Sequence, residues 1–183
     1  MTKIEIWKLA LGEIGCVDTV DSEADTTAEA AQCRAAWPTA CDMVLAAYPW
    51  GCCRREAQLA RRADKASVIW SHVHQLPEDF ISLRSTIPTR IDYALGDQLF
   101  FSDEAHPAIV YSARVAPEKF SPHVAELVAL KLALHLATSL RAGGAALIQT
   151  LHQRYMLALA DARTIEVRGA FTRPRRPRWR LCG

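Results

Sequence analysis

The sequence predicts a mainly α-helical fold of the α+β class: a helical bundle of about four helices with a β-rich insertion, formed by a hairpin plus a strand, and an extended C-terminal arm. Apolar residues recur at the helical spacings of three and four over residues 2–14, 27–48, 121–141 and 145–166. Residues 52–115 instead carry strand-forming residues separated by turn signals. Because arginine and proline dominate residues 168–183, we expect one domain over residues 1–167 followed by a basic arm.

The first two helices each have a capping residue and one apolar stripe. Thr2 caps the first helix, which ends at Gly15, and Thr27 caps the second. Pro38 lies inside the second stripe, so this helix either kinks there or consists of two shorter helices. The stripes comprise Ile4, Trp7, Leu11 and Ile14 in the first helix, and Ala30, Cys33, Trp37, Ala40, Val44 and Ala47 in the second.

The β-rich insertion has three recognisable parts. Residues 67–70, Val73 and residues 76–80 mix strand-forming residues with prolines. Residues 91–101 predict a hairpin around Gly96 and Asp97, and residues 108–115 make a further strand. On a strand, the adjacent Cys52 and Cys53 would point to opposite faces, which argues against a zinc site there.

The third helix begins at Ser121 and Pro122, a capping residue followed by proline at the first helical position. It is apolar around most of its circumference, so either its own bundle or a neighbouring subunit must cover it. A ridge of small side chains, which lets another helix approach closely, is assigned here to a subunit interface: Ala125, Ala129, Ala133 and Ala137. Gly143 and Gly144 separate this helix from the last one, which we expect to pack antiparallel to it.

The composition excludes several classes of protein. With 183 residues, 50% of them hydrophobic and 23% charged, the chain has enough apolar material for a core, which excludes a disordered or collagen-like chain. The most apolar segment, residues 121–140, contains Glu126, Lys131 and His135, so no membrane span is expected. The N-terminal residues predict a helix and no signal peptide, which favours the cytoplasm. We expect free thiols at all six cysteines: Cys16, Cys33, Cys41, Cys52, Cys53 and Cys182.

No motif of a known catalytic site occurs, since GxSxG, GxxxxGK[ST], GxGxxG and HExxH are all absent. His72 and His74 share one face of a predicted strand and could begin a metal site, but they are more typical of half-exposed strand residues on either side of Val73. Glu78 and Asp79 could be paired carboxylates, although acids after a proline usually serve turns. We therefore predict no catalytic residue, no metal and no cofactor.

An acidic loop and the histidines of the late helices are two further candidates for a site. The acidic loop with Asp21, Glu23 and Asp25 resembles the start of a calcium loop, but it lacks the glycine and the closing glutamate. The lone histidines of the late helices are expected to be structural: His123, His135 and His152.

The C-terminal arm differs in charge from the rest of the chain. Six of the 22 basic residues follow Glu166 and no acid does, so residues 1–167 carry 16 basic against 20 acidic residues, a formal charge of −4. Two prolines exclude a helix over RPRRPRWR, and an extended arm would project its side chains outward. Such an arm could contact nucleic-acid phosphates, dock into an acidic groove of a protein, or remain a solvated end.

The order of landmarks along the chain resembles that of the podoviral head-to-tail adaptors, the tail tubular protein A family. The landmarks are ALGEIG, AAYPW, LPEDF, YALGDQLFF, IVYSARV, EKFSPHVAELVALKLALHLATSL and HQRYMLALADA, within residues 4–167. The sequence departs from the family pattern at Gly51, Cys52 and Cys53, where an asparagine, an aromatic residue and an alanine are usual.

The resemblance implies a non-enzymatic virion protein that forms a dodecameric ring between the portal protein and the tail nozzle protein. Such a ring completes the head after packaging and continues the DNA channel. The genome would pass through without sequence-specific binding, and no membrane would be involved. Separately from the resemblance, the charge of −4 over residues 1–167 suits a channel, since an acidic lumen would let DNA slide. The helical bundle would form the ring body and the β-rich segment would face the tail. The assigned portal-binding residues belong to the arm: Arg173, Arg175, Arg176, Arg178, Trp179 and Arg180.

Two rival functions come from other classes. A helical nucleic-acid-binding module would use the arginine-rich arm on phosphates, with binding that weakens steeply with salt. A metal-dependent enzyme would use His72 and His74.

Overall fold

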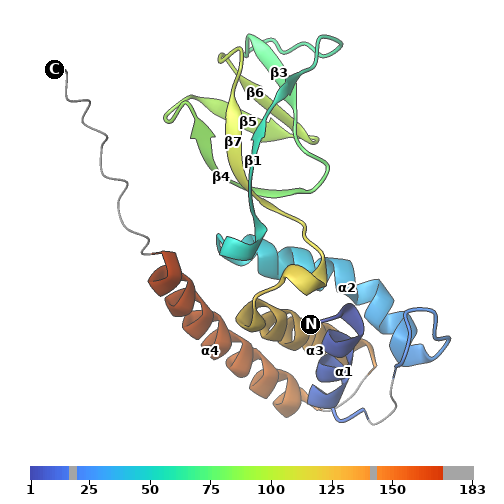
Figure 1. The fold of residues 1–183 in the computed structure, drawn as a ribbon. Coiled ribbons are helices and arrows are strands. Elements are labelled where there is room, and N and C mark those ends of the chain that lie inside the picture. Colours follow the sequence, from blue (N-terminus) through green and yellow to red (C-terminus); the bar gives the residue numbers. More distant parts are fainter. Residues whose placement is uncertain (17–19, 141–143, 171–183) are drawn as a thin grey trace.

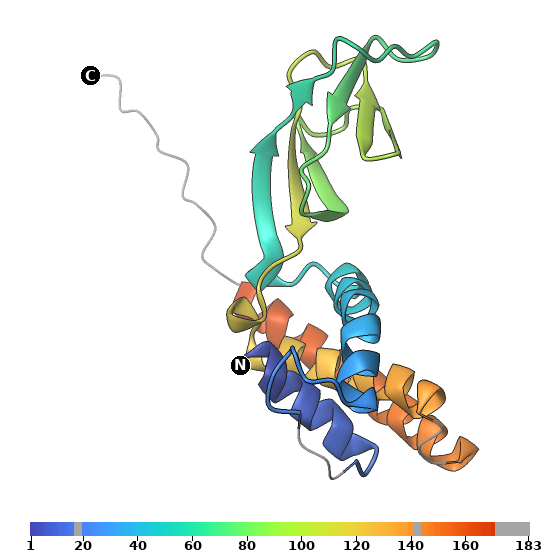
Figure 2. The ribbon, with the colours of Figure 1, turned by 90° about the vertical axis from the view of Figure 1, so that its right-hand side faces the viewer.

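The computed structural model describes residues 1–16, 20–140 and 144–170. Four helices pack together at one end of the molecule, and two small antiparallel sheets rise from them (Figures 1 and 2). The predicted fold class is confirmed: the chain is mainly helical, with the β-rich insertion between the second and third long helices. The C-terminal arm from residue 171 onward lies outside the described residues.

The helices are α1 (Lys3–Glu13), α2 (Ala28–Ala47), α3 (Pro122–Ser139) and α4 (Ala145–Ala170), with short 3₁₀ turns η1 (Gly51–Cys53) and η2 (Pro117–Lys119). Thr2 caps α1 in a capping box with Glu5, and the hydroxyl of Thr27 accepts from the N–H of Ala30 at the start of α2. α4 continues to Ala170, beyond the predicted end at residue 166.

Pro38 does not divide the second helix, because α2 is one helix over its whole length. The proline side chain lies on the exposed face of the helix. The loss of its N–H removes a single backbone hydrogen bond there, and the buried face carries the packing on both sides of it.

The strands form two sheets. The first has the order β1-β7-β4, and the second has the order β2-β3-β6-β5. Their bounds are β1 (Arg54–Gln58), β2 (Ala60–Arg61), β3 (His72–Gln75), β4 (Phe80–Ile87), β5 (Tyr93–Gly96), β6 (Leu99–Ser102) and β7 (Ala108–Ala113).

Three details of the insertion differ from the sequence prediction. Residues 67–70 are not a strand but part of the loop before β3. The hairpin between β5 and β6 turns at Asp97 and Gln98, both with positive φ, one residue later than predicted. Cys52 and Cys53 lie in η1, so they do not alternate across a strand.

One continuous core joins the bundle to the sheets. α3 is its centre, because α1, α2 and α4 all pack against it. Trp7 of α1 and Trp50 beside η1 are fully buried, and Phe100 and Ile109 fill the sheets. No helix within the described ranges is long and apolar enough to cross a membrane.

Candidate functional site

The alanine ridge assigned to the subunit interface lies inside the bundle of its own chain. Ala125, Ala129, Ala133 and Ala137 are each 3% exposed or less. The small side chains do allow close approach, but the approaching helices are those of the same chain. The subunit-interface assignment is therefore wrong for these four residues, since a neighbouring chain cannot reach them.

Among the described helices, α4 carries the most open large apolar side chains, whereas α1 and α2 each carry one, Leu9 and Met43. Four large apolar side chains of α4 are at least 46% exposed: Met156, Leu157, Ile165 and Val167. Leu157, the most open of them at 68% exposure, lines a groove of about 270 Å³ between α3 and α4 together with Leu130 and Ile165. Glu126 and Asp161 add acidic groups to this groove. The outer face of α4 therefore offers more apolar contact area to another molecule than the other described helices do.

The arm residues assigned to portal binding lie outside the described residues. These are Arg173, Arg175, Arg176, Arg178, Trp179 and Arg180. Near the end of the described part of α4, Arg163 and Arg168 line a shallow pocket beside Tyr48.

A cluster of polar contacts connects η1, α3 and α4. Glu166 of α4 accepts from the backbone N–H of Gly51 at 3.0 Å, and its second oxygen lies 2.9 Å from Nε2 of His123. Arg84 of β4 reaches the same place and donates to the carbonyl oxygen of Trp50. The cluster therefore connects the bundle to the first sheet at the point where the chain enters the insertion.

This cluster contains a serine, a histidine and a glutamate, but it is not a catalytic triad. Ser121 Oγ lies 3.0 Å from Nε2 of His123, which is the same ring nitrogen that contacts Glu166. A triad needs the acid on one nitrogen and the nucleophile on the other, so that the ring can carry a proton between them. His123, for which the sequence predicted a structural role, links α3 to α4 through this contact.

The two adjacent cysteines form a second part of the same junction. Cys53 is buried, its Sγ lies 3.3 Å from the carbonyl oxygen of Trp50, and it accepts from Arg84 at 3.3 Å. Hydrogen bonding from Cys53 lowers the pKa of the Cys52 thiol to about 6, with Ser121 helping and burial opposing. The same bond and burial raise the pKa of Cys53. Cys52 is therefore the more nucleophilic of the two thiols.

The predicted histidine pair is present but is not arranged as a metal site. His72 and His74 have ring centroids 6.2 Å apart. His74 is fully buried, contrary to the half-exposed position predicted, and its Nε2 lies 3.2 Å from the carbonyl oxygen of Ala105. Within residues 1–16, 20–140 and 144–170, no three potential ligand side chains come together around a common point.

Several of the acids singled out in the sequence, Asp79, Asp21 and Glu23, have partners within the chain. Asp79 accepts from the hydroxyl of Tyr111 at 2.9 Å and lies 3.6 Å from Arg55. Burial and this bond to Asp79 raise the pKa of Tyr111 to about 12. In the acidic loop, Asp21 and Glu23 pair with lysines of α1.

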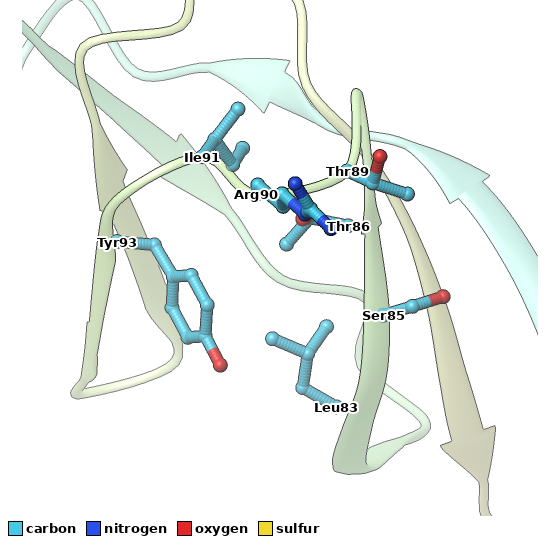
Figure 3. Close-up of a pocket in the computed structure, with 7 residues that line it drawn as sticks. All are labelled: Leu83, Ser85, Thr86, Thr89, Arg90, Ile91 and Tyr93. Carbon is cyan, nitrogen blue, oxygen red and sulfur yellow. The ribbon is translucent and has the colours of Figure 1, made fainter.

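Two further features of the sheets were not singled out from the sequence. A hollow of about 210 Å³ lies between β4 and the segment that leads into β5, with Leu83 and Tyr93 facing each other across it (Figure 3). The loop before β3 leaves Val68 and Ile69 without cover. The β-branched residues of the segment 67–70 predicted a strand, but no strand of the described chain pairs with this segment.

No protein-family model matches the chain, and no curated protein matches it at a significant level.

Proposed function

We propose that the protein is a structural head-to-tail connector of a tailed bacteriophage. In this role, copies of the chain form a ring, a dodecamer by resemblance, that joins the portal to the tail nozzle and continues the DNA channel. Its role is mechanical and needs no catalytic residue. It acts in the neck of the virion and is present in the host cytoplasm during assembly.

The observation that carries the proposal is the open apolar face of α4. The bundle already buries the core-facing side chains of α3 on all sides, yet Leu157 and Ile165 remain exposed beside a groove. A ring subunit needs such a face on the outside of a complete core, because each copy must contact two neighbours. The proposal thereby moves the subunit contact from the alanine ridge of α3 to the outer face of α4.

The basic arm supports the second half of the proposal, the contact with the portal. Its arginines can bind carboxylates with two parallel hydrogen bonds, and Trp179 adds an aromatic anchor. Copies arranged in a ring would engage together, so a modest affinity per arm is sufficient.

The test uses the full-length chain and the portal protein of the same phage. Electron microscopy should show a ring of the chain seated on the portal ring. A chain that ends at residue 167 should lose the portal contact. A variant with all arm arginines changed to lysine is the matched control: it keeps the charge but loses the two-pronged geometry, so its affinity should fall. Full affinity of the shortened chain would contradict portal docking by the arm.

The charge step after Glu166 also favours a second candidate, a nucleic-acid-binding module that uses the arm. This candidate predicts a gel shift with DNA that weakens steeply with salt, disappears without the arm and tolerates the lysine variant. Indifference to DNA, together with portal binding that discriminates between arginine and lysine, would exclude it.

A further inference from the structure

The helices α3 and α4 lie side by side, and the groove between them combines apolar walls with two exposed acids (Figure 1). The groove has a volume of about 270 Å³, and its apolar walls include Leu130 of α3 together with Leu157 and Ile165 of α4. Leu157 is 68% exposed and Ile165 is 51% exposed, so solvent reaches most of these two side chains. The acids are Glu126 of α3 and Asp161 of α4. Such a groove suits a ligand that carries an apolar group flanked by cations.

The negative charge of this groove is not compensated within the described chain. The other two titratable side chains that line the groove already have carboxylate partners. Arg154 pairs with Glu13 of α1, and His123 lies 2.9 Å from Glu166. The two acids of the groove form no ion pair with any residue of the described ranges. A cation from another segment can therefore pair with either acid.

The part of the arm that follows α4 has the complementary composition. Residues 171–183 carry five arginines, one tryptophan and no acidic residue. An arginine side chain can bind a carboxylate with two parallel hydrogen bonds, and an indole ring buries a large apolar area. Arg178 and Arg180 flank Trp179, so cations lie on both sides of the aromatic group. The arm and the groove therefore match in charge and in apolar character.

The arm is long enough to reach the groove from the end of α4. Each helical residue advances by about 1.5 Å, so Leu157 lies about 20 Å back along the helix from Ala170. In the extended geometry that prolines favour, each residue spans about 3.1 Å, so the chain from Ala170 to Trp179 spans about 28 Å. The difference of about 8 Å leaves roughly two or three residues for the chain to reverse its direction.

The tether between arm and groove favours a contact within one chain over the same contact between two copies. A short linker holds the arm near its own groove at an effective concentration of about millimolar, whereas a separate copy at micromolar concentration competes about a thousandfold less well. A modest affinity is therefore sufficient to close the contact within one chain.

We propose that, in a subunit that is not bound to the portal, the arm folds back onto its own bundle and places Trp179 in the groove beside Leu157. The arginines around the tryptophan pair with Glu126 and Asp161. The groove shares Leu157 and Ile165 with the face of α4 that the proposed ring uses, so the arm and a neighbouring copy exclude each other. This consequence for assembly rests on the proposed function: the portal binds the arm, the face of α4 becomes free, and the ring forms only on the portal.

The first experiment places the photo-reactive amino acid benzoylphenylalanine at position 179 of the full-length chain, where one aromatic group replaces another. Copies labelled with heavy nitrogen are mixed with unlabelled copies at micromolar concentration and irradiated without portal, and mass spectrometry identifies the cross-linked peptides. The expected result is a link to residues 126–130 or 157–165 that joins peptides of the same isotope only. The same probe at Val68, a fully exposed position in the loop before β3, is the control and should give no link to these segments.

Two matched pairs of variants test the contribution of charge to this contact. Glu126→Gln with Asp161→Asn removes both acids of the groove and should lower the yield of the link about fivefold. Asp92→Asn with Asp97→Asn removes two exposed acids from the sheets and should leave the yield unchanged. Unchanged midpoints of thermal unfolding show that the fold is intact in both pairs. An equal fall in yield for both pairs would overturn the contact with the groove.

Sedimentation of the full-length chain without portal tests the consequence for assembly. Trp179→Ala removes the aromatic anchor, so the face of α4 should be free and self-association should occur at a concentration about tenfold lower. Trp179→Phe keeps an aromatic group and is the control, with self-association close to that of the unchanged chain. Equal self-association of Trp179→Ala and the unchanged chain would overturn the mutual exclusion of arm and neighbour.

The remaining outcomes separate this inference from the connector proposal. Links from position 179 to the groove that join heavy and light copies would show exchange of arms between subunits and overturn the fold-back. Rings on the portal in electron microscopy, with a position-179 probe that links only outside the groove in the free chain, would overturn this inference and leave the connector in place. A link within one copy, without any ring on the portal, would support the fold-back contact and overturn the connector.

Discussion

His123 and Glu166 connect the first turn of α3 to the C-terminal part of α4, with 2.9 Å between Nε2 and Oε1. The other oxygen of Glu166 holds the N–H of Gly51, so one carboxylate fastens three segments of the chain. Both side chains of the pair are mostly buried, which makes the contact less screened than an ion pair at the surface. The entry into the β-rich insertion is thereby tied to the end of the bundle.

Glu166→Ala should lower the free energy of unfolding by about 1–3 kcal/mol, because it leaves the Gly51 N–H and the histidine without their acceptor. Glu166→Gln should cost less, since an amide oxygen can still accept one of the two bonds. Urea unfolding measures both changes. Glu118→Ala, at an exposed glutamate in η2, is the control and should stay within about 0.5 kcal/mol. Equal midpoints for Glu166→Ala and the control would contradict the fastening role.

The two fully buried tryptophans should respond differently to replacement by phenylalanine. Trp50 donates from Nε1 to the carbonyl oxygen of Val44 at 2.7 Å, whereas Nε1 of Trp7 meets no acceptor in the described part of the chain. Trp50→Phe should therefore cost about 1–3 kcal/mol more than Trp7→Phe. Chemical denaturation of the two variants measures the difference, and a larger loss for Trp7→Phe would refute the argument.

Cys52 should react with iodoacetamide faster than the other described cysteines at pH 7. The hydrogen bond from Cys53 lowers the pKa of Cys52 below that of an ordinary thiol, so a larger fraction of Cys52 is thiolate at neutral pH than of the other described thiols, and this fraction falls as the pH drops. Burial raises the pKa of Cys33 to about 11, which protects that thiol. Mass spectrometry after short labelling gives the site, and Cys53→Ala, which removes the hydrogen bond, should slow the labelling of Cys52. If Cys33 were labelled before Cys52, the predicted order of reactivity would be wrong.

His135 should make the fold less stable in acid. Burial, helped by the charge of Lys131, lowers its pKa below the ordinary 6.5, and its Nε2 has no partner in the described chain. The unfolded chain therefore takes up the proton at higher pH than the folded chain, so stability is lost as the pH falls below about 6.5. His135→Leu and His135→Gln should both flatten the dependence of the unfolding midpoint on pH between 7 and 5. An unchanged slope in both variants would contradict this origin.

Local features of the sequence predicted the helices well, because caps and periodicity act within a few residues. Thr2 and Thr27 mark helix starts in the sequence and in the structure. The alanine spacing of α3 correctly indicated close packing but could not indicate which helix approaches. Strand-forming residues at 67–70 likewise favour a strand only where a neighbouring strand offers hydrogen bonds.

The contacts of the candidate site could not be predicted, because their partners are far apart in the sequence. His123 and Glu166 are 43 residues apart, and Gly51 and Glu166 are 115 residues apart. The residues next to His123, Gly51 and Glu166 in the sequence do not indicate which distant residue each of them contacts. The open face of α4 depends in the same way on which sides of that helix the rest of the bundle covers.

The β-rich insertion leaves and rejoins the bundle at one place, since Arg54 at its start pairs with Ser112 near its end. Because the two ends of the insertion lie side by side, the insertion can be lengthened, shortened or exchanged while the helices keep their connections. Evolution could therefore alter the sheets to suit different neighbours on that side of the molecule while the four helices stay as they are.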